Sequence, residues 1–216
     1  MPGVDEIHHA GEQTEQPDDR IAREVQRQRQ RDGLEAVRVH GEKLEAQRLR
    51  VQATRTYLEL TSPRDFRPAF GDFTAVTVAR EPRPTPDLYR ACYRTVGEAY
   101  HWRDRWDWSD AEIRRHLADP AISLHVARRD GRLHGWYELR WVADDDSVEI
   151  AYFGIVGEAI GRGFGKHLLS CAVRDAWALR PQRVWLHTCT LDHPHALPNY
   201  VARGFTAYKT ETYEVT

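Results

Sequence analysis

The stretch "AIGRGFGKHLL", residues 159–169, places three glycines and two cations in a short loop that runs into an apolar helical segment. Glycines crowded at the start of a helix indicate that the backbone comes close to another group. The loop lies between a β-rich stretch at 147–155 and a helix predicted from about Arg162 to Leu179. These residues therefore predict a strand–loop–helix unit whose helix start faces an anionic ligand.

Two nucleotide-binding patterns do not fit this loop. A Walker A loop has a glycine where Ile160 stands and a Ser or Thr where His167 stands. A dinucleotide fingerprint, G-x-G-x-x-G, needs a third glycine at the position of Lys166. The acyl-CoA pyrophosphate pattern, Q/R-x-x-G-x-G/A, is matched at Gly163 and Gly165 and departs only at Ile160.

Three further stretches extend this match beyond the loop. The strand "VEIAYFGIV" precedes it, "RVWLHTC" follows its helix, and "ALPNYVARGF" has the spacing A-x-x-x-Y-x-x-x-G-F, with Ala196, Tyr200, Gly204 and Phe205 in register. Together they make residues 73–216 resemble the GNAT N-acetyltransferase superfamily. The resemblance implies a central, mostly antiparallel sheet in which the strands at 147–155 and 183–189 splay apart.

The order of predicted elements agrees with that fold. Alternating stretches predict strands at 54–60 and 73–79, and Thr85 and the pair Ser109 and Glu112 predict the starts of two helices. Asp130-Gly131 predicts the turn of a hairpin. Strand 147–155, the helix after the loop, strand 183–189, a short helix near 195–203 and a final strand follow. The order indicates an α/β fold, in the sense of an α+β mixed sheet with helices on both faces.

The N-terminal fifty residues differ from the rest, because they contain no Phe, Trp or Tyr. We expect a disordered tail at 1–19, an amphipathic helical extension at 20–53, a strand and linker at 54–72 and the acyltransferase domain at 73–216. Leu34, Val37 and Leu44 follow a rough heptad spacing that Arg48 interrupts. This pattern favours a helix on its own domain or in solvent over a dimerisation helix. We expect a monomer, or a homodimer formed through this helix.

Composition excludes several classes of partner. The net charge of -2 argues against a general nucleic-acid binder. No apolar run approaches the length of a membrane span, and the N-terminal stretch has no apolar core of a signal peptide. The cysteines, Cys92, Cys171 and Cys189, form no C-x-x-C pair and fit a reducing compartment. We therefore expect a cytoplasmic protein with no nucleic-acid or membrane partner.

The resemblance implies acetyl-CoA as co-substrate. Backbone N–H groups at a helix start and nearby cations stabilise a pyrophosphate, whereas the alternative reading is a glycine turn needed only for packing. The backbone of the strand would bind the pantetheine arm. The cofactor-binding residues implied in this way are Phe153, Gly154, Ile155, Gly161, Arg162, Gly163, Phe164, Gly165, Lys166 and Asn199. Gly154 alternatively marks a β-bulge.

Three residues are candidates for the chemistry of acetyl transfer to an amine by direct attack on the thioester. Glu149 lies on an otherwise apolar strand and is the expected base, directly or through a water; the alternative is an edge-exposed or salt-bridged glutamate. Tyr152 is the alternative group for holding that water or the substrate. By resemblance, Tyr200 protonates the leaving thiolate; the alternative is a half-buried helix tyrosine.

The acceptor is a small-molecule or peptide amine that no sequence feature identifies. Trp102, Trp106 and Trp108 crowd one loop together with several aspartates, and such a loop suits a cationic amine. The alternative for these rings is packing over the sheet.

One stretch suggests a metal site by composition alone. It contains His187, Cys189, Asp192, His193 and His195. A buried His and Cys with turn-capping groups is the favoured alternative, and we expect no metal. Two other functions compete with acetyl transfer: a non-catalytic CoA-binding scaffold that recruits a partner through the N-terminal helix, and a metal-dependent hydrolase built on this stretch.

Overall fold

The computed structural model describes residues 26–31, 33–35, 38 and 51–215. The predicted tail at 1–19 and most of the extension at 20–53 lie outside the described residues. The described part of the extension is helical and exposed, with Leu34 at 71% exposure. A separate compact unit spans Gln52–Glu214.

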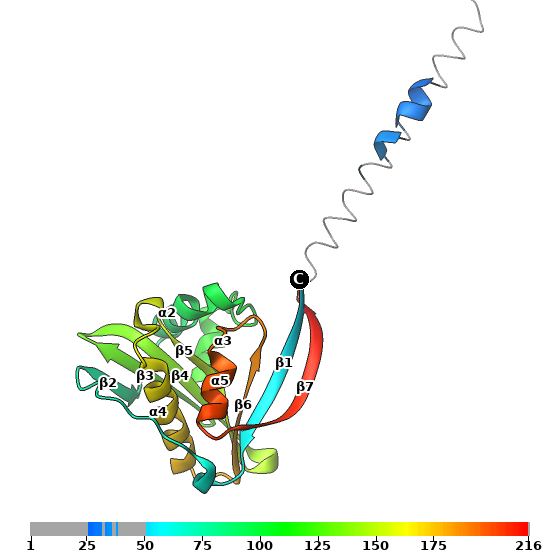
Figure 1. The fold of residues 1–216 in the computed structure, drawn as a ribbon. Helices are drawn as coiled ribbons and strands as arrows, with labels where there is room; N and C mark the ends of the chain where they lie inside the picture. The colour runs from blue at the N-terminus through cyan, green and yellow to red at the C-terminus, as the bar shows by residue number, and fades with distance from the viewer. Residues whose placement is uncertain (1–25, 32, 36–37, 39–50, 216) are drawn as a thin grey trace, which may run out of the picture. The chain divides into compact units, whose positions relative to one another are not determined.

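The elements of this unit follow the predicted order of strands and helices (Figure 1). They are β1 (Val51–Leu60), η1 (Pro63–Asp65), β2 (Val76–Arg80), α2 (Pro86–Gly97), η2 (Glu98–Tyr100), α3 (Asp110–Leu117), β3 (Ile122–Arg129), β4 (Arg132–Val142), η3 (Ala143–Asp145), β5 (Ser147–Ile155), η4 (Gly157–Ala159), α4 (Phe164–Ala178), β6 (Arg183–Cys189), α5 (Ala196–Ala202) and β7 (Thr206–Val215).

The strands form one seven-stranded sheet in the order β2-β3-β4-β5-β6-β1-β7. The pairs β1–β6, β2–β3, β3–β4 and β4–β5 are antiparallel, and β5–β6 is parallel. Figure 1 shows α4 and α5 on one side of the sheet and α2 and α3 on the other. The mostly antiparallel mixed sheet with helices on both faces is confirmed.

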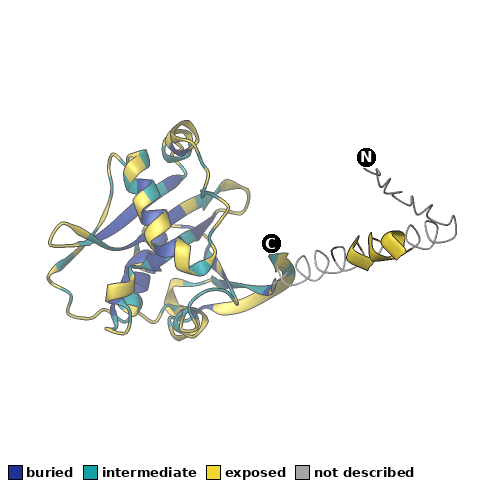
Figure 2. Ribbon diagram, turned by 90° about the horizontal axis from the view of Figure 1, so that it is seen from above, coloured by how far each residue is buried: buried dark blue, intermediate teal, exposed yellow. Residues whose placement is uncertain are grey.

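Each face of the sheet has its own apolar core. Leu168, Leu169 and Val173 of α4 pack with Val148 and other strand residues on one face. On the other face, residues of α2 and α3 pack with one side of β3 and β4; they include Tyr89, Val96, Ile113, Leu124 and Trp136. Figure 2 shows the buried residues concentrated on the strands and on the inward sides of the helices.

The local sequence signals act as predicted. The Thr85 side chain accepts from the N–H of Leu88 at the start of α2. Ser109 and Glu112 form a reciprocal capping box at the start of α3. Between β3 and β4, Asp130 and Gly131 have φ of 50° and 75°, the left-handed pair that a tight hairpin turn requires.

Three element boundaries differ from the prediction. β1 begins at Val51, and β2 spans Val76–Arg80 rather than 73–79. The helix of the loop begins at Phe164, because Gly163 has a φ of 78° that an α-helix cannot contain. β1 lies inside the sheet, between β6 and β7. The sheet therefore extends to both sides of the predicted domain boundary at residue 73.

Candidate functional site

The strands β5 and β6 pair along only part of their length. Within the described residues, their register ends at the pair Glu149–Trp185. β5 continues to Ile155, while β6 continues to Cys189 in register with β1. Beyond Glu149, β5 therefore presents a backbone edge that β6 does not pair with. This is the predicted splay.

A β-bulge lies near the start of that unpaired edge. Glu138 lies opposite Tyr152, but the next residue of β4, Leu139, lies opposite Ile150, so Ala151 is the extra residue of β5. A bulge bends its strand and increases the local twist. The sequence alternative of a bulge at Gly154 is wrong, because Gly154 pairs in regular register with Trp136.

Gly154 is required by the packing of α2. A Cβ added there would lie 2.4 Å from Cγ1 of Val96. That separation is far below a van der Waals contact, so a side chain at 154 would push α2 off the sheet. Contact with Val96 therefore explains why residue 154 is a glycine.

We expect Gly154→Ala to lower the free energy of unfolding by about 1–3 kcal/mol through overpacking. In a Val96→Ala background the two Cγ atoms are gone, so the same substitution should cost less. Urea unfolding of the four proteins of this double-mutant cycle measures the coupling. An equal cost of Gly154→Ala in both backgrounds would show that Val96 is not the reason for the glycine.

The loop before α4 has the backbone shape of an anion cradle. Gly161 and Gly163 have φ of 80° and 78°, in the left-handed region that favours glycine. Gly163 is the N-cap and provides no side chain to the first-turn N–H groups. A Cβ on Gly165 would make only ordinary contact, 3.5 Å from Cδ1 of Ile155. The helix start is thus left open toward an outside acceptor of hydrogen bonds.

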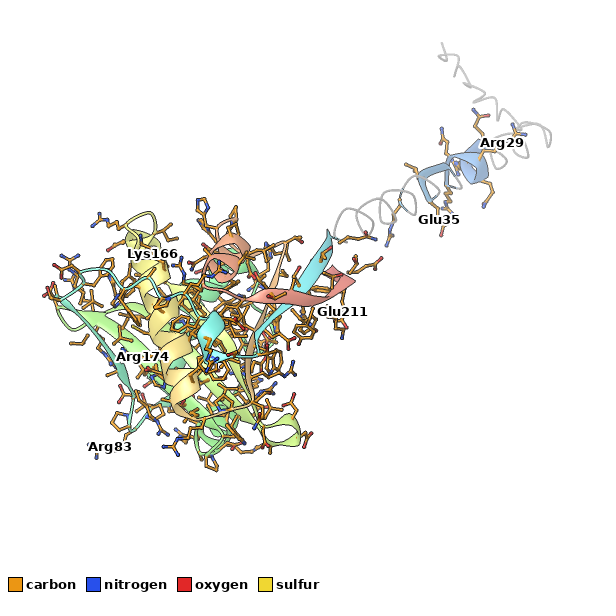
Figure 3. All side chains as sticks on the ribbon, turned by 60° about the horizontal axis from the view of Figure 1, so that its bottom comes forward. Arg29, Glu35, Arg83, Lys166, Arg174 and Glu211 are labelled. Atoms are coloured by element: carbon orange, nitrogen blue, oxygen red, sulfur yellow. The ribbon has the colours of Figure 1, made fainter. Side chains whose placement is uncertain are left out.

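The predicted side chains of this loop divide into two groups. Arg162 and Lys166 are exposed, and Figure 3 shows Lys166 at the start of α4. Phe164 is buried and stacks edge-on against Phe73, with ring centroids 5.2 Å apart. Phe164 therefore offers only its backbone to a ligand, whereas the two cations offer their charges.

The helix α5 brings two predicted residues to the same place. The Asn199 side chain donates a hydrogen bond to the carbonyl of Gly165, 3.5 Å away, which ties α5 to the start of α4. The ring of Tyr200 lies 6.3 Å from the ring of Phe153 on the unpaired part of β5. Burial raises the pKa of Tyr200. Its phenol is therefore held protonated, the state that a proton donor needs.

Glu149 lies on the opposite face of the sheet, the one that carries α2 and α3. Its side chain is 7% exposed, and Nη2 of Arg140, directly across on β4, lies 2.5 Å from its Oε2. Burial raises the pKa of Glu149, and the charge of Arg140 opposes this without cancelling it. Glu149 is thus a salt-bridged glutamate, as one sequence alternative held, with the raised pKa of a candidate base.

The tryptophan loop is occupied by the protein's own groups. Trp102, Trp106 and Trp108 pack against the core under α2 and α3. Arg103 lies over Trp106, at 4.8 Å, and Arg105 over Trp108, at 4.9 Å. These three rings thus form a packed wall rather than an open cage for a cation.

Hydrogen bonds join Tyr152 and its neighbours to the same packed wall. Its hydroxyl donates to Asp104, which also accepts from the Tyr93 hydroxyl at 2.7 Å. Asp110, an aspartate at the start of α3, pairs with Arg90 at 2.7 Å. Both carboxylates are therefore committed to protein partners.

The sequence interpretation missed the most buried charge on this face, Glu138. Its side chain is 0% exposed and accepts from Tyr89 at 3.0 Å, from Arg105 at 2.9 Å and from His116 at 2.9 Å. Burial raises its pKa, but the bonds and charges of His116 and Arg105 outweigh burial and hold the pKa below its usual range. The alternation of "GWYELRW" places Glu138 on the face of Trp136 and was the available signal.

In the His- and Cys-containing stretch, the turn-capping group of the sequence alternative is present, but His187 is exposed and Cys189 half-buried rather than buried. Asp192 accepts from Oγ1 of Thr188 at 2.6 Å and from the N–H of Cys189 at 2.8 Å, so it caps the turn after β6. Among the described residues, no group of three or more His, Cys, Asp or Glu side chains is placed to hold a metal ion. The described helices also include none that is long and apolar enough to span a membrane.

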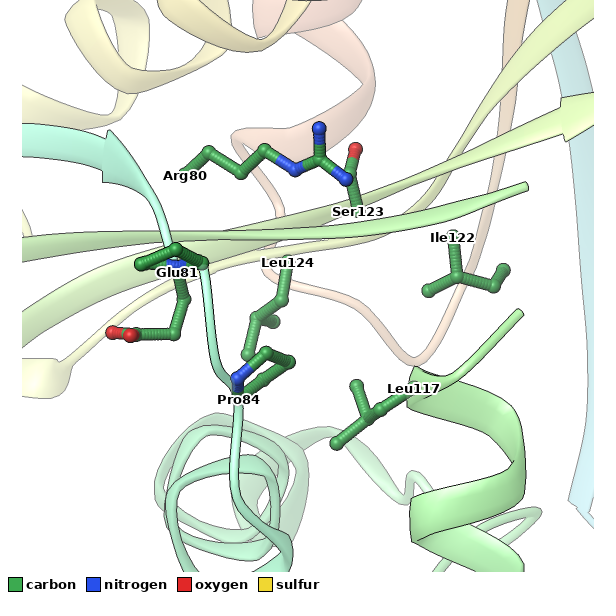
Figure 4. A pocket seen from close by; sticks show the side chains of 8 residues that line it. Arg80, Glu81, Pro84, Leu117, Ile122, Ser123 and Leu124 are labelled. Carbon is green, nitrogen blue, oxygen red and sulfur yellow. The ribbon is translucent and has the colours of Figure 1, made fainter. Parts of the chain in front are cut away.

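A surface hollow lies elsewhere, between the linker from β2 to α2 and the junction of α3 with β3 (Figure 4). No predicted site residue lines it. Its lining residues are Arg80, Glu81, Pro82, Pro84, Leu117, Ile122, Ser123 and Leu124.

Comparison with solved structures supports the fold. A GCN5-related N-acetyltransferase from Kribbella flavida superposes with a TM-score of 0.53 at 20% identity, over 74% of this chain and 56% of that one. One from Sphaerobacter thermophilus has a TM-score of 0.54 at 17% identity, over 81% and 56%. An aminoglycoside acetyltransferase from a soil metagenomic sample has a TM-score of 0.52 at 12% identity, over 62% and 90%. The chain thus spans just over half the length of the first two.

Comparison with family models gives the membership. A search of curated proteins found no match. The model of the Acetyltransferase (GNAT) family matches residues 85–205, more than half of the chain, from the start of α2 to the end of the Y-x-x-x-G-F segment. The chain therefore belongs to the GNAT acetyltransferase family.

Proposed function

We propose that the protein moves an acetyl group from acetyl-CoA to an amine by direct attack of the amine on the thioester. One observation carries this proposal: the unpaired edge of β5 begins beside a buried carboxylate, Glu149, and passes the phenol of Tyr200. A proton acceptor and a proton donor thus flank the same stretch of free backbone.

The residues at the start of α4 fit the pyrophosphate of CoA. Gly161 and Gly163 set the turn, and the first-turn N–H groups have no side-chain cap. Arg162 and Lys166 are exposed at the same place and supply positive charge. Ile160, where the family pattern has Gln or Arg, removes one side chain from this set but no backbone donor.

Acetyl-CoA supplies the thioester carbonyl and the thiolate leaving group. The backbone of Phe153 and Ile155 holds the pantetheine arm along the unpaired edge. A free N–H of this edge donates to the thioester oxygen as negative charge develops there. Glu149 removes one proton of the incoming ammonium group. The Tyr200 hydroxyl protonates the departing sulfur and regains a proton from the nitrogen of the tetrahedral intermediate.

Thermal unfolding with and without acetyl-CoA tests the ligand. A ligand at about 100 times its Kd stabilises the folded state by about 2.7 kcal/mol, so the melting temperature should rise by several degrees. The charge reversals Arg162→Glu and Lys166→Glu should reduce the rise, whereas Arg64→Glu, an exposed arginine after β1, should not. The absence of any shift with acetyl-CoA would contradict the proposal. A shift without acetylation of any amine would favour the non-catalytic CoA-binding alternative.

The pH profile tests Glu149. Because burial raises its pKa and only the ionised carboxylate accepts a proton, kcat/KM should increase as pH rises through that pKa. We expect Glu149→Gln to lower kcat/KM about tenfold or more and to flatten this increase. Initial rates of thiol release across pH measure both effects. A profile of Glu149→Gln that keeps the wild-type increase would exclude Glu149 as the base.

A further inference from the structure

The face under α2 and α3 carries two buried carboxylates with very different surroundings. Glu138 is enclosed by hydrogen bonds from Tyr89, Arg105 and His116. In the described part of the chain, Arg140 is the one basic side chain within ion-pair distance of Glu149. The negative charge of Glu138 is therefore stabilised by three hydrogen-bond donors, whereas that of Glu149 is stabilised at ion-pair distance by Arg140 alone among the basic side chains of the described residues.

That partner, Arg140, is far more exposed to solvent than Glu149. The Arg140 side chain is 48% exposed, against 7% for Glu149. Its Nη2 lies 2.5 Å from Oε2 of Glu149. An ion pair in which one side chain is half in water is weakened by solvent and is more easily exchanged for another cation than a fully buried pair.

The other charges around Glu149 do not replace Arg140. Glu138 repels a second negative charge, and Arg105, which attracts it, is already bound to Glu138. On the β6 side, desolvation and the charges of Arg55 and Arg140 lower the pKa of His187. An ionised Glu149 therefore needs a cation at the place where the Arg140 guanidinium lies.

We propose that Arg140 is the resident counter-ion of Glu149 and that the ammonium group of the acceptor displaces it, so that the enzyme selects alkylamines. The inference rests on the proposed function. The exchange replaces one cation by another, so it buries no additional net charge. Arylamines and alcohols are uncharged near neutral pH and cannot make this exchange.

One of the two protons that leave the acceptor nitrogen passes through this pair. The displaced Arg140 side chain moves into water, and the ammonium proton passes to Glu149, which leaves an uncharged amine nitrogen for attack. After transfer, Glu149 releases that proton to water as Arg140 returns. Arg140 is thus a positioning residue that acts through Glu149 and touches neither the thioester nor the product.

A titration without turnover tests the counter-ion. The carboxyl ¹³C resonance of Glu149, assigned by its loss in Glu149→Gln, reports the pKa directly. Arg140→Gln should raise that pKa, and Arg140→Lys should keep it near the wild-type value. Arg114→Gln, which removes an exposed arginine paired with Asp110, is the matched control and should leave it unchanged.

Chemical rescue tests the exchange itself. Ethylammonium chloride should lower the pKa of Glu149 in Arg140→Gln, because a small cation fills the vacated place. Tetraethylammonium chloride at the same concentration should not, because it has the charge but not the size or the N–H donors. An unchanged pKa of Glu149 in Arg140→Gln, or equal action of the two salts, would overturn the inference.

Acetylation of two amines of similar size tests the selection. Benzylamine should be acetylated about tenfold faster or more than aniline at neutral pH. At a pH above the Glu149 pKa measured in that variant, Arg140→Gln should lower the KM for benzylamine because the competing cation is gone. Equal rates for both amines would overturn the inference and leave the proposed function standing. Transfer to no amine, with normal titration and rescue, would instead count against the proposed function.

Discussion

Replacing Arg105 with leucine is expected to lower the free energy of unfolding by about 3–5 kcal/mol, the cost of leaving a buried charge unpaired. The Arg105 side chain is 12% exposed, and its Nη1 lies 2.9 Å from Oε1 of Glu138, which is 0% exposed. The same guanidinium lies over the ring of Tyr152, at 4.3 Å. Its loss therefore removes an ion pair and a packing contact together.

Two further variants isolate the charge. Arg103→Leu, an exposed arginine over Trp106, should change the free energy of unfolding by at most about 1 kcal/mol. In the double variant Arg105→Leu with Glu138→Leu, most of the loss should be recovered, because no buried charge remains. Urea unfolding measures all three. If the double variant is no more stable than Arg105→Leu, the packing contact rather than the buried charge explains the effect.

The buried carboxylate also sets a pH dependence of stability. The folded-state pKa of Glu138 lies below its usual range. Its pairing therefore contributes stability above the unfolded pKa of about 4.3, and this contribution is lost as pH falls through the lower folded pKa. Arg105→Leu should lose this contribution at neutral pH.

Tyr200→Phe is expected to lower kcat about a hundredfold, in the range that a positioned general acid contributes. The phenylalanine keeps the ring contacts with Phe153 and Phe205, both at 6.3 Å between centroids. The fold and the acetyl-CoA site should therefore be preserved while the hydroxyl proton is lost. The Kd for acetyl-CoA should stay within about twofold, since a shift below 0.5 kcal/mol is typical of a change without direct contact.

Turnover with a good acceptor, together with titration calorimetry of acetyl-CoA, separates these effects. Tyr208→Phe is the matched control, because this tyrosine lies exposed on β7, outside the proposed site. A Tyr200→Phe protein with normal kcat and weakened acetyl-CoA binding would place the hydroxyl in binding rather than in proton transfer.

The local parts of the site were readable from sequence. The glycine loop, the caps at Thr85 and Ser109 and the Asp130-Gly131 turn depend on neighbours within a few residues, so their signals lie side by side in the chain. The Y-x-x-x-G-F spacing likewise carries the geometry of α5, on which the ring of Tyr200 lies 6.3 Å from that of Phe153 of β5.

Other parts of the site were not readable, because they join distant segments. Arg105 and Glu138 are 33 positions apart, and only the packing of the tryptophan loop on β4 brings them together. Gly154 is a glycine because a side chain there would clash with Val96 on α2. The sequence had instead suggested that the absent side chain makes room for CoA. No sequence pattern singles out Arg140, because its role depends on Glu149, the residue opposite it on β5.

The sequence by itself determined the order of the elements, the helix start after the glycine loop and the position of Tyr200 on α5, because short-range backbone geometry and spacing carry that information. Only the tertiary structure decided which charges are free to act. The register of β4 against β5 pairs Glu149 with the half-exposed Arg140, while burial and three hydrogen-bond donors fix Glu138. A carboxylate acts as a base or as a buried anchor according to its desolvation and its partners, and both are set by contacts between segments far apart in the chain.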